Sequence, residues 1–419
     1  MPHDSGDLGS PPLRVALLGN FGIGNLGNDA SLDALIQLVR RADPDVSITV
    51  VCTNPDVVRT RFGVPAYATR SRRPQGRLSG TRLGALLELP GRLADVRQAF
   101  RVCGTVDALV APGTGILDDF GSPKPTGWPL GLFVWMGAAR LRRTRTALVS
   151  VGAGPLRHPV SRRFARWASS MADHRSFRDR GSRAFMMSIG LDVPADEVVP
   201  DIVFSLPSPE ATRPPSARPL VAVPVMNYSG WQASAKSPAI AERNVETLTS
   251  FCLWLLGEGY AVRLVTADAS DEPATDEVAA RVRAAEPERA DVWLTTAVAV
   301  DLPDLMCLLT DAVAVVATRY HSVVSGLICG KPTISLGYGA KNTDLMQTVG
   351  LGAFCQHVEH VDQELLRGQL TEAVADAPRL SRLVASRVEE LRAQLEGEEQ
   401  RLQASVLGSR RRVRARRRG

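Results

Sequence analysis

An arginine and a histidine directly follow a strongly apolar segment, in the sequence Thr318-Arg319-Tyr320-His321-Ser322. The apolar residues 312–317 are typical of a buried parallel strand, and residues 322–328 favour the start of a helix. Two cationic side chains would therefore meet the N–H groups of a helix N-terminus at the end of a strand. Because arginine suits bidentate contact with carboxylates and phosphates, the pattern predicts a site for a compact anion. A surface ion pair for Arg319 and a helix cap at His321 are the structural alternative.

A glycine-rich segment, residues 22–27, separates the first strand-like segment from the first helical one and has a formal G-x-G-x-x-G pattern centred on Gly24. Two observations argue against a nicotinamide cofactor. The next strand-like segment ends in residues 52–54, Cys-Thr-Asn, where a ribose-binding acid is needed, and Asp29 would repel a phosphate docked at the helix N-terminus. We therefore interpret Asn25 and Asp29 as groups that bind a hydroxyl or accept a proton. An aspartate-capped helix behind a glycine turn is the structural alternative.

Three further loops follow strand-like segments and carry residues that can contact a ligand. Gly113 and Gly115 allow close approach to the backbone, and the carboxylate of Asp118 could bind sugar hydroxyls or take a proton. Arg178 precedes a helix in the first half of the chain and would face the cleft from the domain opposite Arg319. Lys341 follows a strand-like segment that is expected to lie beside the strand before Arg319. Turn residues and a surface lysine are the alternatives for these positions.

The composition indicates a globular chain with more than one core, because its 419 residues are 44% hydrophobic and 22% charged. No run reaches the eighteen apolar residues of a membrane span, and the N-terminus lacks a signal-peptide pattern, so we expect a cytoplasmic protein. The six cysteines stand singly, which favours reduced thiols. His357 and His360 lack a third nearby ligand, so we expect no metal.

The net charge of +6 is concentrated at the C-terminus, where residues 410–419 carry seven arginines and the remainder is close to neutral. Such a run favours a disordered tail with weak attraction to an anionic membrane surface, placing the protein peripherally at the inner membrane face. The segment 70–82 carries five arginines among Ser, Gly and Pro and favours a mobile basic loop. We expect no specific nucleic-acid partner.

Strand-like and helix-like segments alternate in both halves of the chain, which predicts an α/β fold of two doubly wound Rossmann-like domains facing across a cleft. Apolar positions recur at helical spacing near the C-terminus and predict a long helix that packs back across the domains. The predicted limits are a disordered N-terminus over 1–12, a first domain over 13–205, a Pro-rich linker over 206–219, a second domain over 220–380, a C-terminal helix over 381–407 and a basic tail over 408–419.

Taken in order, these loops resemble the polysaccharide pyruvyl transferase family, from Gly19 to about Gly350. The opening Gly-Asn-Phe-Gly-Ile-Gly-Asn-Leu-Gly is similar to the family's G-x-x-G-x-x-N-x-G-D-E start. Further family motifs have similar segments in this chain. Residues 113–117 resemble G-G-G-L-L, and residues 176–182 resemble S-x-R-D-x-x-S. In the second half, Arg319-Tyr320-His321 resembles R-x-H, residues 330–333 resemble G-x-P, and Tyr338 with Lys341 resembles Y-x-x-K. The chain departs from the pattern at Asn28 and Asp29, where the family has Asp and Glu, and at Thr114. These changes lie on the side expected to bind the acceptor.

The resemblance implies a GT-B-like fold and the transfer of pyruvate from phosphoenolpyruvate, the donor substrate, to two hydroxyls of a sugar or lipid-linked glycan in cell-envelope polysaccharide synthesis. No cofactor is required by this scheme. The first domain would bind the acceptor and the second the donor. The implied catalytic residues are His321, as the acid, and Asp29 or Asp118, as the base; the implied binding residues are Arg178, Arg319, Lys341, Asn25, Gly24, Gly113, Gly115 and Tyr338. A nucleotide-sugar glycosyltransferase and a non-catalytic anion-binding relative are the alternatives.

Overall fold

The computed structural model describes residues 12–70, 89–119, 127–193, 196–210, 217–230 and 237–408. The predicted disordered N-terminus and basic tail lie almost wholly outside these residues. Most of the predicted basic loop and part of the predicted linker also lie outside them.

The first half of the chain forms a seven-stranded parallel sheet in the order β3-β2-β1-β4-β5-β6-β7. Its strands are β1 (Arg14–Leu18), β2 (Ser47–Cys52), β3 (Ala66–Ala68), β4 (Ala108–Pro112), β5 (Arg145–Val151), β6 (His174–Phe177) and β7 (Glu197–Val198). Both faces are covered, which explains the continuous apolar runs: Val15 and Leu17 of β1 join one core, and Ala16 and Leu18 join another. Helices α1 (Leu26–Ala42) and α2 (Pro55–Phe62) pack in the first core; α4 (Leu89–Cys103), α5 (Trp128–Arg142), α6 (Pro159–Ser170) and α7 (Arg180–Ser188) pack in the second.

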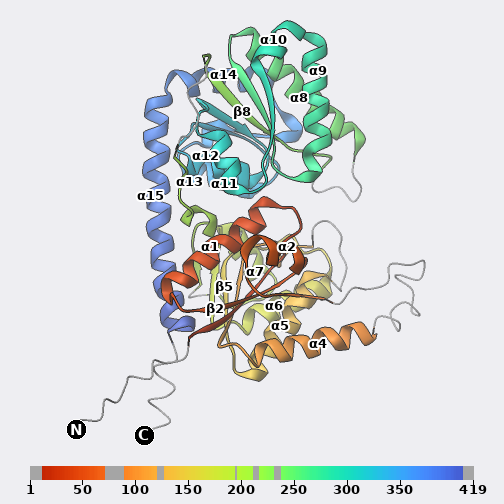
Figure 1. Cartoon of the computed structure of the whole chain (residues 1–419), viewed down its shortest axis with the longest axis vertical. Helices are drawn as coiled ribbons and strands as arrows, with labels where there is room; N and C mark the ends of the chain where they lie inside the picture. Colours follow the sequence, from red (N-terminus) through yellow and green to blue (C-terminus); the bar gives the residue numbers. More distant parts are fainter. Residues whose placement is uncertain are drawn as a thin grey trace, which may run out of the picture.

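The second half forms a six-stranded parallel sheet in the order β10-β9-β8-β11-β12-β13. Its strands are β8 (Leu220–Val225), β9 (Ala261–Thr266), β10 (Leu294–Val298), β11 (Ala314–Ala317), β12 (Thr333–Gly337) and β13 (Cys355–His357). Its helices are α8 (Pro238–Gly257), α9 (Glu272–Ala285), α10 (Pro287–Trp293), α11 (Leu302–Leu309), α12 (Tyr320–Ile328), α13 (Ala340–Thr348) and α14 (Gln363–Ala375). In both sheets the central strands reverse the direction of winding, so the predicted pair of doubly wound domains is confirmed (Figure 1).

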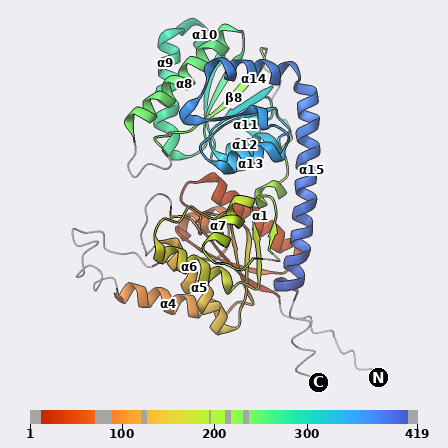
Figure 2. The same ribbon diagram turned by 180° about the vertical axis from the view of Figure 1, so that it is seen from behind.

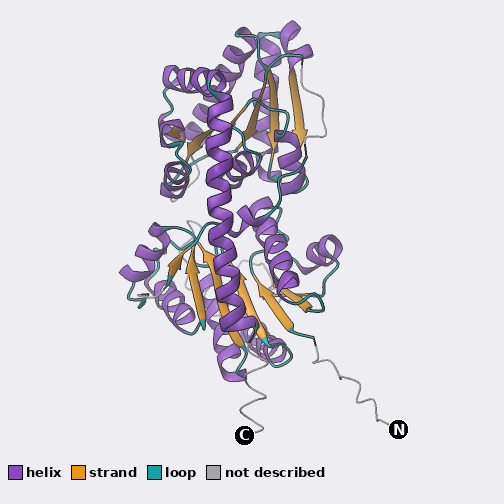
Figure 3. Cartoon of the chain, turned by 90° about the vertical axis from the view of Figure 1, so that its left-hand side faces the viewer, coloured by secondary structure: helices purple, strands orange, loops and turns teal. Residues whose placement is uncertain are grey.

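The chain ends in the long helix α15 (Ala377–Leu402), followed by a helical turn, Gln403–Leu407. Figure 3 shows this helix running alongside both sheets. It returns to the first domain, where the buried Glu398 lies 2.7 Å from Nε2 of His174 and Arg392 donates to the backbone carbonyls of Phe204 and Leu206. The predicted closing helix is therefore confirmed, although it begins four residues earlier than expected. Among the described helices, none is both long and apolar enough to cross a membrane.

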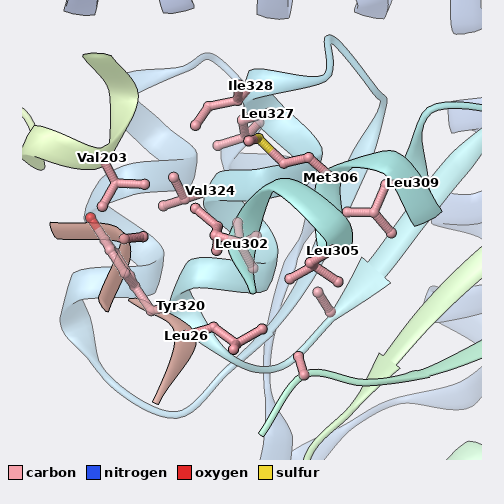
Figure 4. Close-up of a cluster of buried hydrophobic side chains, with 14 of the residues drawn as sticks. Leu26, Val203, Leu302, Leu305, Met306, Leu309, Tyr320, Val324, Leu327 and Ile328 are labelled. Carbon is pink, nitrogen blue, oxygen red and sulfur yellow. The ribbon is translucent and has the colours of Figure 1, made fainter. Parts of the chain in front are cut away.

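Apolar side chains join the two domains beside the ends of the sheets. Leu26 opens α1, and Val203 lies in the short 3₁₀ helix Ile202–Ser205 between the sheets. Figure 4 shows both beside side chains of α11 and α12, among them Leu302 and Val324. Burial of these residues holds the first turn of α1 against α12 and so brings the loops of the two sheets together.

Candidate active site

A pocket of about 150 Å³ lies between the two domains, at the carboxyl ends of strands from both sheets. The first domain contributes the loops after β1, β4 and β6, and the second contributes those after β9, β11 and β12. Nine of the predicted site residues line it: His321, Asp118, Arg178, Arg319, Lys341, Asn25, Gly113, Gly115 and Tyr338. Motifs that are far apart in the sequence therefore share one cavity.

The second domain presents two helix N-termini at this pocket. Among the described residues, no side chain caps α12 or α13, and neither helix has an acid in its first turn. Instead, His321 lies in the first turn of α12 and Lys341 in the first turn of α13. An uncapped helix N-terminus carries about half a positive charge and N–H groups able to bind an anion. This side of the pocket is therefore suited to a negatively charged ligand.

The N-terminus of α1, on the opposite wall, has both a side-chain cap and an acid in its first turn. The Asn25 side chain accepts a hydrogen bond from the backbone N–H of Asn28 at 3.1 Å, and Asp29 lies in the first turn. The Asn28 side chain in turn donates to the backbone carbonyl of Asn20 at 3.0 Å. Asn20, Asn25 and Asn28 all line the pocket, so the N-terminus of α1 offers amide groups rather than positive side chains. Neutral amides are suited to sugar hydroxyls.

The ring of Tyr320 lies between cationic groups from the two domains. The Arg178 guanidinium carbon is 5.0 Å from the ring centroid, and Lys341 Nζ is 5.5 Å from it. Lys341 Nζ is also 4.7 Å from the ring centroid of Tyr338. These distances allow cation–π attraction, which holds Arg178 and Lys341 beside the pocket. Burial raises the pKa of the Tyr320 hydroxyl, so it stays neutral at physiological pH.

Asp201 connects the two domains beneath the pocket. Its Oδ2 lies 3.3 Å from Nη1 of Arg178 and 3.6 Å from Nε2 of His321, and the residue is 4% exposed. The second distance is that of an ion pair rather than a hydrogen bond. Burial acts to raise the pKa of Asp201, but the His321 ring, the Arg178 charge and the Val203 N–H outweigh it and lower the pKa to about 2. Asp201 is therefore ionised and can anchor an arginine of one domain and a histidine of the other.

Two glycines make room for these cationic side chains. A Cβ at Gly27 would lie 1.8 Å from Nδ1 of His321, and a Cβ at Gly152 would lie 2.3 Å from Nη2 of Arg178. Real Cβ atoms essentially never approach other atoms so closely. Gly27 therefore has a steric role: it lets the histidine of the second domain rest against α1.

Arg319 lines the pocket, but its charge is shared with acids of its own domain. Its Nη2 donates to Oδ1 of the fully buried Asp271 at 2.7 Å, its Nε donates to the other oxygen of the same carboxylate, and Nη1 is 3.6 Å from Asp268. The guanidinium fork is thus engaged by acids of its own domain, and ligand binding by Arg319 stays a prediction. Because removal of one partner of a buried pair costs about 3–5 kcal/mol, an alanine at Arg319 would mix a structural effect with any effect on ligand binding.

Two predicted site residues, Asp29 and Gly24, do not line the pocket. Asp29 is 3% exposed; its Oδ1 accepts from Gly22 N–H at 2.8 Å and its Oδ2 is 3.2 Å from Nη1 of Arg61. Burial raises the pKa of Asp29 despite these two partners. The carboxylate thus holds the glycine-rich loop in place, and the structure does not put it where a base could reach a pocket ligand. Gly24 adopts a φ of +82°, which favours glycine at this turn.

Sequence reasoning missed Asp201, Asp268 and Asn20. Asp201 stands alone among apolar residues in Val199-Pro200-Asp201-Ile202, and an acid in so apolar a segment was a signal of a buried, paired carboxylate. No such signal marks Asp268 or Asn20. Within the described residues, no group of three or more His, Cys, Asp or Glu side chains could hold a metal ion.

Comparison with known proteins agrees with this arrangement. A family model described as polysaccharide pyruvyl transferase matches residues 25–339. No curated protein matches the chain significantly in sequence.

The fold is similar to those of several solved structures. A glycosyltransferase from Rickettsia africae is 10% identical over 94% of this chain and 99% of that one, with a TM-score of 0.60. A UDP-GlcNAc 2-epimerase from Methanocaldococcus jannaschii is 9% identical over 86% and 93%, with a TM-score of 0.57. At such low identities the likeness shows the GT-B-like fold alone. The family model, in contrast, covers most of the chain and includes all the described lining residues except Asn20, Ile23 and Lys341. The chain belongs to the polysaccharide pyruvyl transferase family.

Proposed function

We propose that the protein transfers pyruvate from phosphoenolpyruvate to two hydroxyls of a sugar or lipid-linked glycan, forming a cyclic ketal. The observation that carries the proposal is the asymmetry of the pocket. Its second-domain wall has two uncapped helix N-termini with His321 and Lys341 in their first turns. Its first-domain wall has amide groups, the carboxylate of Asp118 and Arg178, whose charge is paired with Asp201. One wall suits an anionic donor and the other a polyhydroxyl acceptor.

The charge of the donor fits the donor wall. Phosphoenolpyruvate carries a carboxylate and a phosphate, about two and a half to three negative charges at neutral pH. Arg178 and Arg319 are already paired with Asp201 and Asp271, so the two helix N-termini supply a large part of the attraction. We expect the donor phosphate and carboxylate to lie against α12 and α13.

The reaction requires one proton to be delivered to carbon. The methylene carbon of the donor becomes a methyl group, its central carbon forms bonds to two sugar oxygens, and the bond from that carbon to the phosphate oxygen breaks. One of the two hydroxyl protons balances the proton taken up by the methyl group, and the other leaves with phosphate. His321 is placed to protonate the methylene carbon, because it lines the donor wall and lies within the field of the ionised Asp201. Asp118 lines the pocket and is the candidate acceptor of the hydroxyl proton.

A nucleotide-sugar glycosyltransferase is the second candidate, because a further hollow of about 290 Å³ adjoins the pocket. The hollow is lined by residues 226–230, Ser270, Asp268 and Arg319, at the ends of β8 and β9. A sugar nucleotide could extend into it from the pocket. However, Arg319, the cation that lines this hollow, is already paired with Asp271 and lies 3.6 Å from Asp268, so the hollow offers a diphosphate little net positive charge.

The proposal is tested by separating donor binding from turnover in two variants. His321→Asn should keep most donor affinity and slow turnover by about a hundredfold to ten-thousandfold, the usual contribution of a positioned general acid. Lys341→Met should weaken donor binding by about tenfold to a hundredfold, because a charge-assisted contact contributes about 1.5–3 kcal/mol. Donor titrations and single-turnover phosphate release with a pyruvyl acceptor measure both. Turnover of His321→Asn at the parent rate would show that the histidine is structural.

A further inference from the structure

The outer surface of the helices α4, α5 and α6 has an unusual composition for a face exposed to water. Helix α5 contains no charged side chain from Trp128 to Ala139, although it belongs to the outer layer of the first domain. Leu130 and Val134 are half-buried, and Leu141 is 71% exposed. A surface helix of a globular protein normally places charged residues on its outer side. The outer stripe of α5 is therefore apolar, and Leu141 near its end is left exposed to water.

The two helices that flank α5 surround this stripe with arginine. The three helices together contain eight arginines and a single acid, Asp95. Arg97 and Arg101 are exposed on α4, and Arg162 and Arg163 on α6. No described acid pairs with Arg97, Arg101 or Arg163, in contrast with the many arginines elsewhere in the protein that form ion pairs. The charges of Arg97, Arg101 and Arg163 are thus not neutralised by acids within the described part of the protein.

Large apolar side chains are exposed beside these arginines. Leu93 on α4 is 63% exposed and Trp167 on α6 is 42% exposed. The Trp167 ring packs on Phe133 of α5 and Phe164 of α6, at centroid distances of 5.8 and 6.1 Å, which joins the two helices into one surface. Figure 2 shows α4, α5 and α6 side by side, on the side of the first domain away from α15.

We propose that this face, the outer surface of α4, α5 and α6, docks on an anionic lipid bilayer. Arginines without acids provide attraction to anionic headgroups, and exposed Leu and Trp side chains enter the boundary between headgroups and acyl chains. A nucleic acid would use the arginines but leave the exposed Leu93 and Leu141 in water, so the apolar residues favour a membrane. The inference does not depend on the proposed pyruvyl transfer. If both hold, the acceptor wall of the pocket belongs to the domain that lies on the membrane.

The charge component is tested with the full-length protein and vesicles of phosphatidylcholine with or without phosphatidylglycerol. Each arginine near an anionic surface contributes about fivefold to the partition constant, so Arg97→Gln/Arg163→Gln should lower binding to the anionic vesicles by about thirtyfold. The matched control, Arg243→Gln/Arg283→Gln, changes two exposed arginines of the second domain and should leave binding unchanged. Equal losses in the two double variants would overturn the proposal, because binding would then follow net charge rather than this face.

The apolar component is tested with Leu141→Ser/Trp167→Ser, which keeps every charge. We expect this variant to bind anionic vesicles at least tenfold more weakly and to bind a polyanion such as heparin as the parent does. Unchanged vesicle binding would overturn the proposal and identify the face as a polyanion-binding surface. Sedimentation of the parent and the variant adds a further check: loss of a parent dimer in the variant, without a change in vesicle binding, would show that a second copy of the chain covers the face instead.

Discussion

Replacement of Asp201 by asparagine tests the link between the domains. The change keeps the shape of the side chain and removes its charge, leaving the Arg178 guanidinium and the His321 ring without their shared carboxylate. The pKa of Asp201 falls from 3.8 to about 2 in the folded protein. Since one pKa unit corresponds to about 1.4 kcal/mol, the ionised carboxylate stabilises the folded state by about 2 kcal/mol at neutral pH.

The sign of the pH dependence follows from the direction of the pKa shift. Because the pKa is depressed, the stabilisation is fully present above pH 3.8 and is lost as the pH falls toward 2. Urea denaturation should therefore show Asp201→Asn to be less stable than the parent by about 2 kcal/mol at pH 7 and at pH 5, with a smaller difference near pH 3. As a control, Glu242→Gln removes an exposed partner of Arg281 and should have no measurable effect. Equal stability of Asp201→Asn and the parent at pH 7 would refute the assignment of Asp201 as a buried anchor.

Three further outcomes are expected. Gly27→Ala should slow turnover by about a hundredfold, because the added methyl displaces His321; in a His321→Ala background the same change should have little further effect on single-turnover rates. Asn28→Asp should lower the free energy of unfolding by about 1–2 kcal/mol, because a carboxylate cannot donate to the Asn20 carbonyl; a more stable variant in urea denaturation would contradict this. Deletion of residues 410–419 should leave turnover of a soluble acceptor unchanged and weaken binding to anionic vesicles, and a loss of soluble activity would place the tail within the fold or the site.

The repeating elements of the fold could be predicted from the sequence because their burial has a regular pattern. The strands Ser47–Cys52, Leu220–Val225 and Ala261–Thr266 coincide with apolar runs in the sequence. A strand in a sheet that is covered on both faces is apolar at consecutive positions. Continuous apolar runs in the sequence therefore indicate sheets with helices on both faces. The convergence of Arg178 and Lys341 on one pocket could also be predicted, since parallel strands place their carboxyl ends at a common edge.

The partners of the charged residues could not be predicted in the same way. Arg319 pairs with Asp271, 48 positions earlier in the chain, and Asp201 lies 3.6 Å from His321 of the other domain. Such pairs depend on how closely two loops approach, which hydrophobic periodicity does not report. Asp29 shows the same limit: its position in the first turn of α1 was predicted, but its engagement by Gly22 depends on the path of the glycine-rich loop.

The central claim is that the pocket binds phosphoenolpyruvate as the donor. Its most direct test is a thermal-shift titration of the parent protein with phosphoenolpyruvate, UDP-GlcNAc and NAD in parallel. Phosphoenolpyruvate at a hundredfold its dissociation constant should add about 2.7 kcal/mol of stability, and Lys341→Met should need a higher concentration for the same shift. UDP-GlcNAc and NAD should have no effect. Stabilisation by UDP-GlcNAc or NAD, with none by phosphoenolpyruvate, would contradict the account.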